Sequence, residues 1–168
     1  MAHAPLILDS TIILNMLSVN SLETLLAVDR EFCTTDFVLN SIRKSICEST
    51  FAKLEKSQKL KIYSTNMDVE KFFELCSSLR EMLSIEGCSV LFHAEKTKAT
   101  LLSSDWNLLN MAKKKNVQSF NLLDVLECMI KRGLLSKAEA IDSLTTLMDE
   151  NQTLQKEECE KKIIRWKN

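Results

Sequence analysis

Short apolar runs that alternate with helical patterns along the whole chain constrain the fold more than any other feature of this sequence. Five of these runs have strand character, at residues 6–8, 31–34, 60–64, 99–102 and 117–120. Segments with helical spacing separate the runs. Strands that alternate with helices form a parallel sheet with helices on both faces. We therefore predict an α/β protein, a three-layer α/β/α sandwich around a central parallel sheet of about five strands.

The predicted helices carry recognisable end signals. Their patterns cover residues 10–17, 20–28 and 36–56, a helix capped by Thr65 or Asn66 that runs to residue 79, and residues 84–94, 106–115, 122–131 and 136–148. Asn20 with Glu23 and Ser136 with Glu139 have the spacing of capping boxes. Gly133 is the residue type that commonly ends a helix. These signals predict where three of the helices begin or end.

The composition changes near residue 149. The chain has 168 residues, 45% of them apolar, which suits one buried core. We assign residues 1–148 to the α/β domain. Residues 149–168 are rich in Glu, Gln and Lys, and we interpret them as a C-terminal helical extension, either a surface helix or a tail that docks on a partner. Its basic residues are expected on a solvated face: Lys161, Lys162, Arg165 and Lys167.

Composition excludes several classes of protein. Only two glycines and one proline occur, which excludes glycine-rich phosphate loops and proline-rich linkers. A formal charge of -1 provides no general basic surface, so any binding of nucleic acid must be local. The six cysteines form no CxxC pair and no Cys/His cluster, which argues against zinc and a disulfide framework. No apolar stretch approaches the roughly 20 residues of a membrane span, and we expect a cytoplasmic protein.

Two aspartates follow predicted strands and precede predicted helices. Asp9 follows the first strand, and Asp105 follows the strand at residues 99–102. Each is explained by itself as an N-cap of the next helix. At the carboxyl edge of one parallel sheet, however, the two carboxylates would lie close enough to repel each other. A divalent cation such as Mg²⁺ resolves that repulsion.

Five segments, in this order, resemble one family. They are Leu6-Ile7-Leu8-Asp9-Ser10-Thr11-Ile12-Ile13-Leu14-Asn15, Thr35-Asp36-Phe37-Val38-Leu39-Asn40-Ser41-Ile42, Ser84-Ile85-Glu86-Gly87-Cys88-Ser89-Val90, Ala99-Thr100-Leu101-Leu102-Ser103-Ser104-Asp105-Trp106-Asn107-Leu108 and Gly133-Leu134-Leu135-Ser136. Together they resemble the PIN domains, metal-dependent ribonucleases of parallel α/β fold that include many bacterial toxins. The resemblance covers about residues 5–148.

The resemblance implies roles for particular residues. Asp9 and Asp105 match the first and last acids of the family site, which implies catalytic and metal-binding roles with Mg²⁺ or Mn²⁺. Ser103 matches a hydroxyl residue just before the last acid, and with Asn107 it is a candidate for binding substrate. The family usually has two further acids where this chain has Ser41 and Gly87. Half of the acidic set is therefore missing, and the site is degenerate.

The two degenerate positions can also be judged from the residues alone. With Ser84 as N-cap, Gly87 occupies the third helical position, where an acid helps most and glycine costs roughly 1 kcal/mol relative to alanine. Either close backbone packing or the loss of a charge explains this glycine. Ser41 is tolerable if it bonds back to a carbonyl. Three nearby acids are candidate replacement ligands: Asp36, Glu48 and Glu86.

Other residues near the expected site have ordinary explanations. His93 is expected to be partly buried and hydrogen-bonded rather than a base or ligand. Trp106 either touches substrate or anchors the start of its helix. The lysines at residues 113–115 complement a helix C-terminus and lie too far from the site to contact the scissile phosphate.

Three functions follow from these observations. The first is a Mg²⁺- or Mn²⁺-dependent endoribonuclease of weak activity. The second is a non-catalytic module that binds RNA or a protein partner. The partners that we consider are RNA, a protein such as an antitoxin, and a second copy of the chain in a homodimer. The third is a receiver-like signalling domain with a phosphorylated strand-end aspartate, which the extra helices between the third and fourth strands disfavour.

Overall fold

A parallel five-stranded sheet in the order β3-β2-β1-β4-β5 organises the chain. The computed structural model describes residues 4–65 and 68–168. The strands are β1 (Leu6–Leu8), β2 (Phe32–Thr35), β3 (Leu60–Tyr63), β4 (Thr100–Leu102) and β5 (Ser119–Phe120). Each strand begins within two residues of its predicted start. The three central strands, β1, β2 and β4, are almost wholly buried, as is typical of a parallel sheet covered on both faces, whereas the edge strands β3 and β5 are partly exposed.

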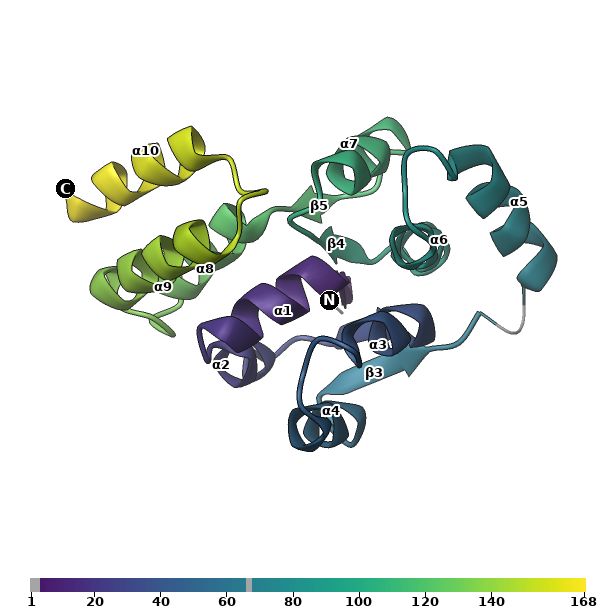
Figure 1. The fold of residues 1–168 in the computed structure, drawn as a ribbon, viewed down its shortest axis with the longest axis horizontal. Helices are drawn as coiled ribbons and strands as arrows, with labels where there is room; N and C mark the ends of the chain where they lie inside the picture. The colour runs from purple at the N-terminus through teal and green to yellow at the C-terminus, as the bar shows by residue number, and fades with distance from the viewer. Residues whose placement is uncertain (1–3, 66–67) are drawn as a thin grey trace.

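Helices fill the connections between strands and the C-terminal part of the chain (Figure 1). They are α1 (Ser10–Ser18), α2 (Leu22–Leu26), α3 (Asp36–Ile42), α4 (Glu48–Glu55), α5 (Val69–Leu79), α6 (Ile85–Thr97), α7 (Trp106–Lys114), α8 (Leu122–Lys131), α9 (Lys137–Glu150) and α10 (Lys156–Lys167). Along the chain, β2 and β3 are added on one side of β1, and β4 and β5 are then added on its other side. Right-handed crossovers then place the two groups of helices on opposite faces. The predicted three-layer sandwich is confirmed.

The pairing of β1 with β4 lies at the centre of the sheet. Leu6 aligns with Thr100 and Leu8 aligns with Leu102. The helical connections change faces between these two strands, and such a switch point is where open α/β sheets bind ligands. The residues that immediately follow β1 and β4 are therefore placed side by side at the carboxyl edge.

Two of the helix predictions are wrong in detail. The pattern over residues 36–56 is not one helix, because Cys47 adopts an extended backbone between α3 and α4. The predicted capping box at Asn20 is also wrong. Asn20 has φ +52°, a conformation that asparagine tolerates, and Ser21 occupies the N-cap position of α2 without a side-chain cap.

Other helix ends can be compared directly with their predictions. Asp68, not Thr65, occupies the N-cap of α5, and Asn66 lies outside the described residues. The capping box of Ser136 with Glu139 is confirmed by hydrogen bonds in both directions. Gly133 has φ +69°, as expected for a residue that ends a helix. Asn121 begins α8 with a further capping box that the sequence analysis did not identify.

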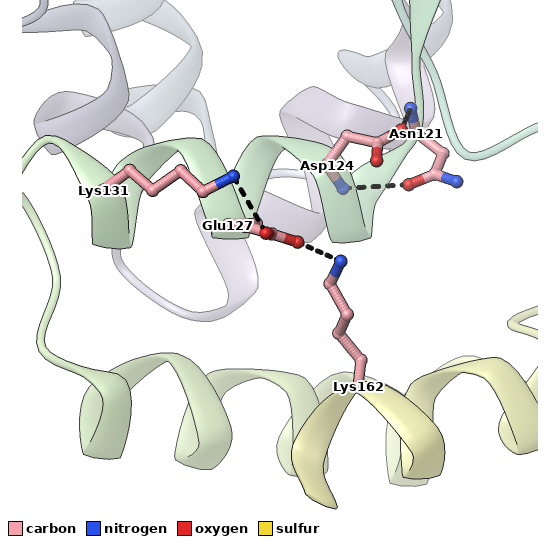
Figure 2. A network of polar contacts seen from close by, with 5 residues as sticks. All are labelled: Asn121, Asp124, Glu127, Lys131 and Lys162. Carbon is pink, nitrogen blue, oxygen red and sulfur yellow. Dashed lines mark hydrogen bonds and ion pairs between the residues drawn. The ribbon is translucent and has the colours of Figure 1, made fainter. Parts of the chain in front are cut away.

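The C-terminal helix α10 packs against α9, and α8 lies alongside (Figure 1). Cys159 and Trp166 of α10 are buried. Glu127 of α8 forms ion pairs with Lys131, at 3.0 Å, and with Lys162 of α10 (Figure 2). Lys162 is thus not on a solvated face as predicted, because this ion pair holds it against α8. The domain boundary at residue 148 stays a prediction.

None of the described helices is long and apolar enough to span a membrane.

Gly87 lies in the first turn of α6, where Ser84 accepts a hydrogen bond from its amide at 3.1 Å. A Cβ atom added at Gly87 would lie 3.5 Å from Ser84 Oγ and 3.9 Å from Leu108 Cδ2, which are ordinary contact distances. The predicted alternative of close packing therefore does not explain this glycine.

We expect Gly87→Ala to raise the free energy of unfolding by about 0.5–1 kcal/mol, since alanine loses less backbone entropy in a helix and fits the space available. Chemical denaturation measures this change. Gly133→Ala is the matched control and should lower the free energy of unfolding, because Gly133 has a positive φ. A loss of stability in Gly87→Ala would contradict the prediction.

The ion pairs of Glu127 predict a dependence of stability on pH. Lys162 and Lys131 lower the pKa of Glu127 from 4.5 to about 2. A depressed pKa stabilises the fold above pH 4.5, and this contribution is lost as the pH falls toward 2. Glu127→Gln should therefore lower the free energy of unfolding at pH 7, with the difference from wild type shrinking as the pH falls. Urea denaturation across this range tests it. Glu160→Gln, on the exposed face of α10, should have little effect at any pH.

Candidate functional site

Asp9 occupies the first position after β1, at the centre of the carboxyl edge. Its amide donates to the carbonyl of Leu102 at 3.0 Å, so the β1–β4 pairing fixes its backbone. Its side chain is 3% exposed and forms no cap hydrogen bond with α1. Asp9 therefore occupies the N-cap position of α1 without the side-chain cap that the N-cap explanation requires, and its carboxylate is buried in the protein.

Hydroxyl groups surround the buried carboxylate of Asp9. Thr11 Oγ1 and Ser103 Oγ each donate to Asp9 Oδ2 at 2.8 Å. Ser10 Oγ lies 3.4 Å from Asp9 Oδ1. Oδ2 thus receives two short hydrogen bonds from within the protein.

Burial raises the pKa of Asp9 above its ordinary value. The hydrogen bonds from Thr11 and Ser103 act in the opposite direction, because they favour the ionised form, but they compensate for only part of the lost hydration. The carboxylate is therefore harder to ionise than an exposed aspartate.

The hydroxyl contacts extend into a polar network between β1, β4 and the helices. Ser103 Oγ accepts from the amide of Asp105 at 3.0 Å, and Thr11 Oγ1 accepts from the amide of Ser104 at 2.8 Å. Asn15 Nδ2 of α1 donates to Ser104 Oγ at 3.2 Å. Sequence reasoning missed the parts played by Thr11, Asn15 and Ser104. Asn15 offered a signal, since it is a buried polar residue on an otherwise apolar face of α1.

Asp105 is the N-cap of α7, as one of the two predicted explanations states. Its Oδ1 accepts from the amides of Asn107, at 2.8 Å, and Leu108, at 3.2 Å, which leaves Oδ2 outside the cap. The side chains of Asp9 and Asp105 are linked through Ser103, whose hydroxyl donates to Asp9 and accepts from the Asp105 amide. The structure thus brings the two predicted acids to one edge but gives them different surroundings.

The two candidate substrate contacts differ sharply in access. Ser103 is fully buried and its hydroxyl serves Asp9. Asn107 is exposed in the first turn of α7. Trp106 beside it is 61% exposed, so it does not anchor the helix against its neighbours. Of these three side chains, Asn107 and Trp106 are accessible to a ligand.

The two positions that we predicted to be degenerate, and the three candidate replacement acids, have local partners of their own. Ser41 Oγ donates to the carbonyl of Val38 at 2.9 Å, as expected. The candidate replacements have other surroundings: Asp36 accepts from the amide of Phe37, Glu48 pairs with Arg43, and Glu86 lies half-buried in the first turn of α6. Within the described residues, no three Asp, Glu, His or Cys side chains gather as a metal site requires.

His93 of α6 lies in an aromatic environment. It stacks on Tyr63 with ring centroids 5.2 Å apart and meets the edge of Phe92 at 5.5 Å. Burial lowers its pKa, so the neutral form is favoured. It is buried as expected, but its Nε2 finds no hydrogen-bond partner among the described residues.

The donor atoms at this edge do not fit a resident Mg²⁺ or Mn²⁺ ion. Mg²⁺ requires a near-octahedral set of oxygen ligands, commonly with one or two accessible carboxylates. Asp9 is buried with hydroxyl hydrogens directed at Oδ2, and Asp105 uses Oδ1 as a helix cap.

Comparison with protein families agrees with the fold. A family model, DUF3368, described as a PIN domain, matches residues 5–168. No curated protein matches the chain. The match runs from β1 through α10, so it includes the C-terminal helix as well as the sheet. The PIN domain is a nuclease-like fold associated with nucleic acids. The chain belongs to the PIN domain family.

Proposed function

We propose that this protein is a PIN-domain module that binds RNA without cleaving it by metal-dependent chemistry. The observation that carries the proposal is the state of Asp9. The side chain is buried, and the hydroxyls of Thr11 and Ser103 take the place that a cation would need at Oδ2. The Asp9 carboxylate therefore already has hydrogen-bond donors within the protein.

The degenerate positions support the same conclusion. Ser41 returns its hydrogen bond to its own helix, and Gly87 has no side chain, although a Cβ fits there. Two ligands are therefore absent where the family usually has them. Fewer acids at this edge also reduce repulsion toward the phosphates of RNA, so binding can survive the loss of cleavage.

An exposed aromatic side chain supports RNA as the ligand. Trp106 is 61% exposed and follows Asp105 directly. Aromatic side chains at single-strand binding sites stack on bases, with a contribution of about 1–3 kcal/mol per base. With a net charge of -1, the binding is expected to be local rather than spread over the surface.

A slow Mg²⁺- or Mn²⁺-dependent endoribonuclease is the second candidate. The observation in its favour is the position of Asp9 and Asp105 at adjacent strand ends, linked through Ser103. For either function, we also propose a protein partner such as an antitoxin, a homodimer and a cytoplasmic location.

RNA binding and metal dependence can be measured together. We expect the protein to raise the fluorescence anisotropy of a labelled RNA, structured or unstructured, by the same amount in Mn²⁺ and in EDTA. The RNA should remain uncut on gels. Trp106→Ala should weaken binding about tenfold. A change in tryptophan fluorescence on addition of RNA provides a second measurement of binding. We assign that change to Trp106, because the other tryptophan, Trp166, is buried at 6% exposure. Cleavage that requires Mn²⁺ and disappears in Asp9→Asn would establish the enzyme instead, and binding of neither RNA would exclude RNA as the ligand.

Restoring the acids provides a matched control. The double variant Ser41→Glu with Gly87→Asp is expected to bind Mn²⁺ at least about tenfold more tightly than wild type by calorimetry, because two carboxylates return to the family positions. Ser41→Gln with Gly87→Asn has similar side chains without charge and should bind Mn²⁺ as weakly as wild type. Equal Mn²⁺ affinity in all three proteins would show that the missing acids do not limit metal binding.

The burial of Asp9 predicts a gain in stability on neutralisation. Asp9→Asn removes the cost of burying a charge while retaining an oxygen acceptor for the hydroxyls, so we expect the free energy of unfolding at pH 7 to rise by about 1 kcal/mol. Urea denaturation measures the change. Asp142→Asn, on the exposed side of α9, should change the same quantity by less than about 0.5 kcal/mol. A marked loss of stability in Asp9→Asn would mean that the ionised carboxylate stabilises the fold.

A further inference from the structure

A pocket separate from the two acids lies on the sheet face covered by α2 and α8. Its volume is about 400 Å³, and most of its lining is apolar. Leu6, Phe32 and Leu102 contribute from the strands. Val125 contributes from α8, and Val28 and Leu134 contribute from the segments that follow α2 and α8. Pockets of this size and character are typical of sites for small molecules.

Positive charge surrounds the apolar lining. Arg30, Lys131 and Arg132 all border the pocket, together with the acids Asp124 and Glu127. The acids are already engaged, because Glu127 pairs with Lys131 and Lys162, and Asp124 accepts from the Asn121 amide in a capping box (Figure 2).

The two arginines remain without a carboxylate partner. Neither Arg30 nor Arg132 forms an ion pair with another described residue. Glu31, next to Arg30 in sequence, pairs instead with Lys61 at 3.6 Å. The local charge at the pocket is therefore positive.

Arg30 also carries an unsatisfied donor. Its Nη2 donates to the carbonyl of Ala4 at 2.6 Å, which holds the guanidinium in place. Its Nε is buried and has no hydrogen-bond partner among the described residues. Buried polar groups almost always have a partner, so the donors of this guanidinium are not all satisfied within the described residues. Arg30 is also one of the residues that line the pocket, where it can meet an anionic group.

We propose that the pocket binds a small amphipathic carboxylate, with its hydrocarbon chain against the apolar lining and its carboxylate on Arg30. A planar carboxylate matches the guanidinium fork, and charge-assisted hydrogen bonds of this type are the strong ones. A nucleotide suits the pocket less well, because the apolar lining would leave the polar edges of its base unpaired. This site is independent of the proposed RNA binding.

Calorimetric titration of the full chain tests the proposal with decanoate below its micellar concentration as the probe. Decanol has the same chain without charge, and acetate has the head group without the chain. We expect decanoate to bind about tenfold more tightly than decanol, and acetate not to bind detectably. Arg30→Gln should reduce decanoate affinity to that of decanol. Arg80→Gln removes an equal charge from an exposed position at the end of α5 and should leave affinity unchanged.

Two exposed cysteines locate the bound probe. Cys128 borders the pocket, whereas Cys47 lies at the start of α4, outside the pocket lining. Decanoate should slow the alkylation of Cys128 by iodoacetamide and leave that of Cys47 unchanged, as measured by peptide mass spectrometry. If Arg30→Gln does not fold, Arg132→Gln provides the charge test. Equal affinity for decanol and decanoate, or unchanged alkylation of Cys128 at saturating decanoate, would overturn the proposal.

Discussion

The parallel pairing of β1 with β4 is the interaction on which the rest of the structure depends. The first strand, β1, lies in the middle of the sheet between β2 and β4. The Asp9 amide continues the pairing beyond the end of β1 by donating to the Leu102 carbonyl. The helical connections on the two sides of this strand pair cover opposite faces of the sheet. The pairing therefore decides which side chains meet at the carboxyl edge, and it brings Thr11 within hydrogen-bond reach of the loop after β4.

The fold could be predicted from sequence wherever burial leaves a continuous pattern. The β1 and β4 runs are apolar because both faces are covered, so their positions were predicted within one residue. The break between α3 and α4 could not be predicted, since no Gly or Pro interrupts the pattern around Cys47. Asn20 misled for a related reason. Its residue type suits an N-cap and also suits a positive φ, so the residue type alone does not decide between them.

The site was harder to predict because its two acids look equivalent in sequence. Each follows a strand and precedes a helix, yet Asp105 caps its helix and Asp9 does not. The difference arises from Ser103, which is 94 positions from Asp9 in the chain and donates to its carboxylate. A contact at such a separation is set by the register of β1 against β4, and local sequence signals do not encode it.

The same contacts explain how a site of this kind can lose its chemistry while the fold persists. Asp9 has partners inside the protein, because Thr11 and Ser103 donate to it and Ser103 also accepts from the Asp105 amide. Replacing Asp9 by an apolar residue would leave these buried hydroxyls without an acceptor, so a structural reason to retain it exists without any cation. The hydrogen bonds that Ser41 and Gly87 form are local, with Val38 and with the N-cap Ser84. On the proposed function, acids can be absent from these two positions at little structural cost, so the fold persists without cleavage.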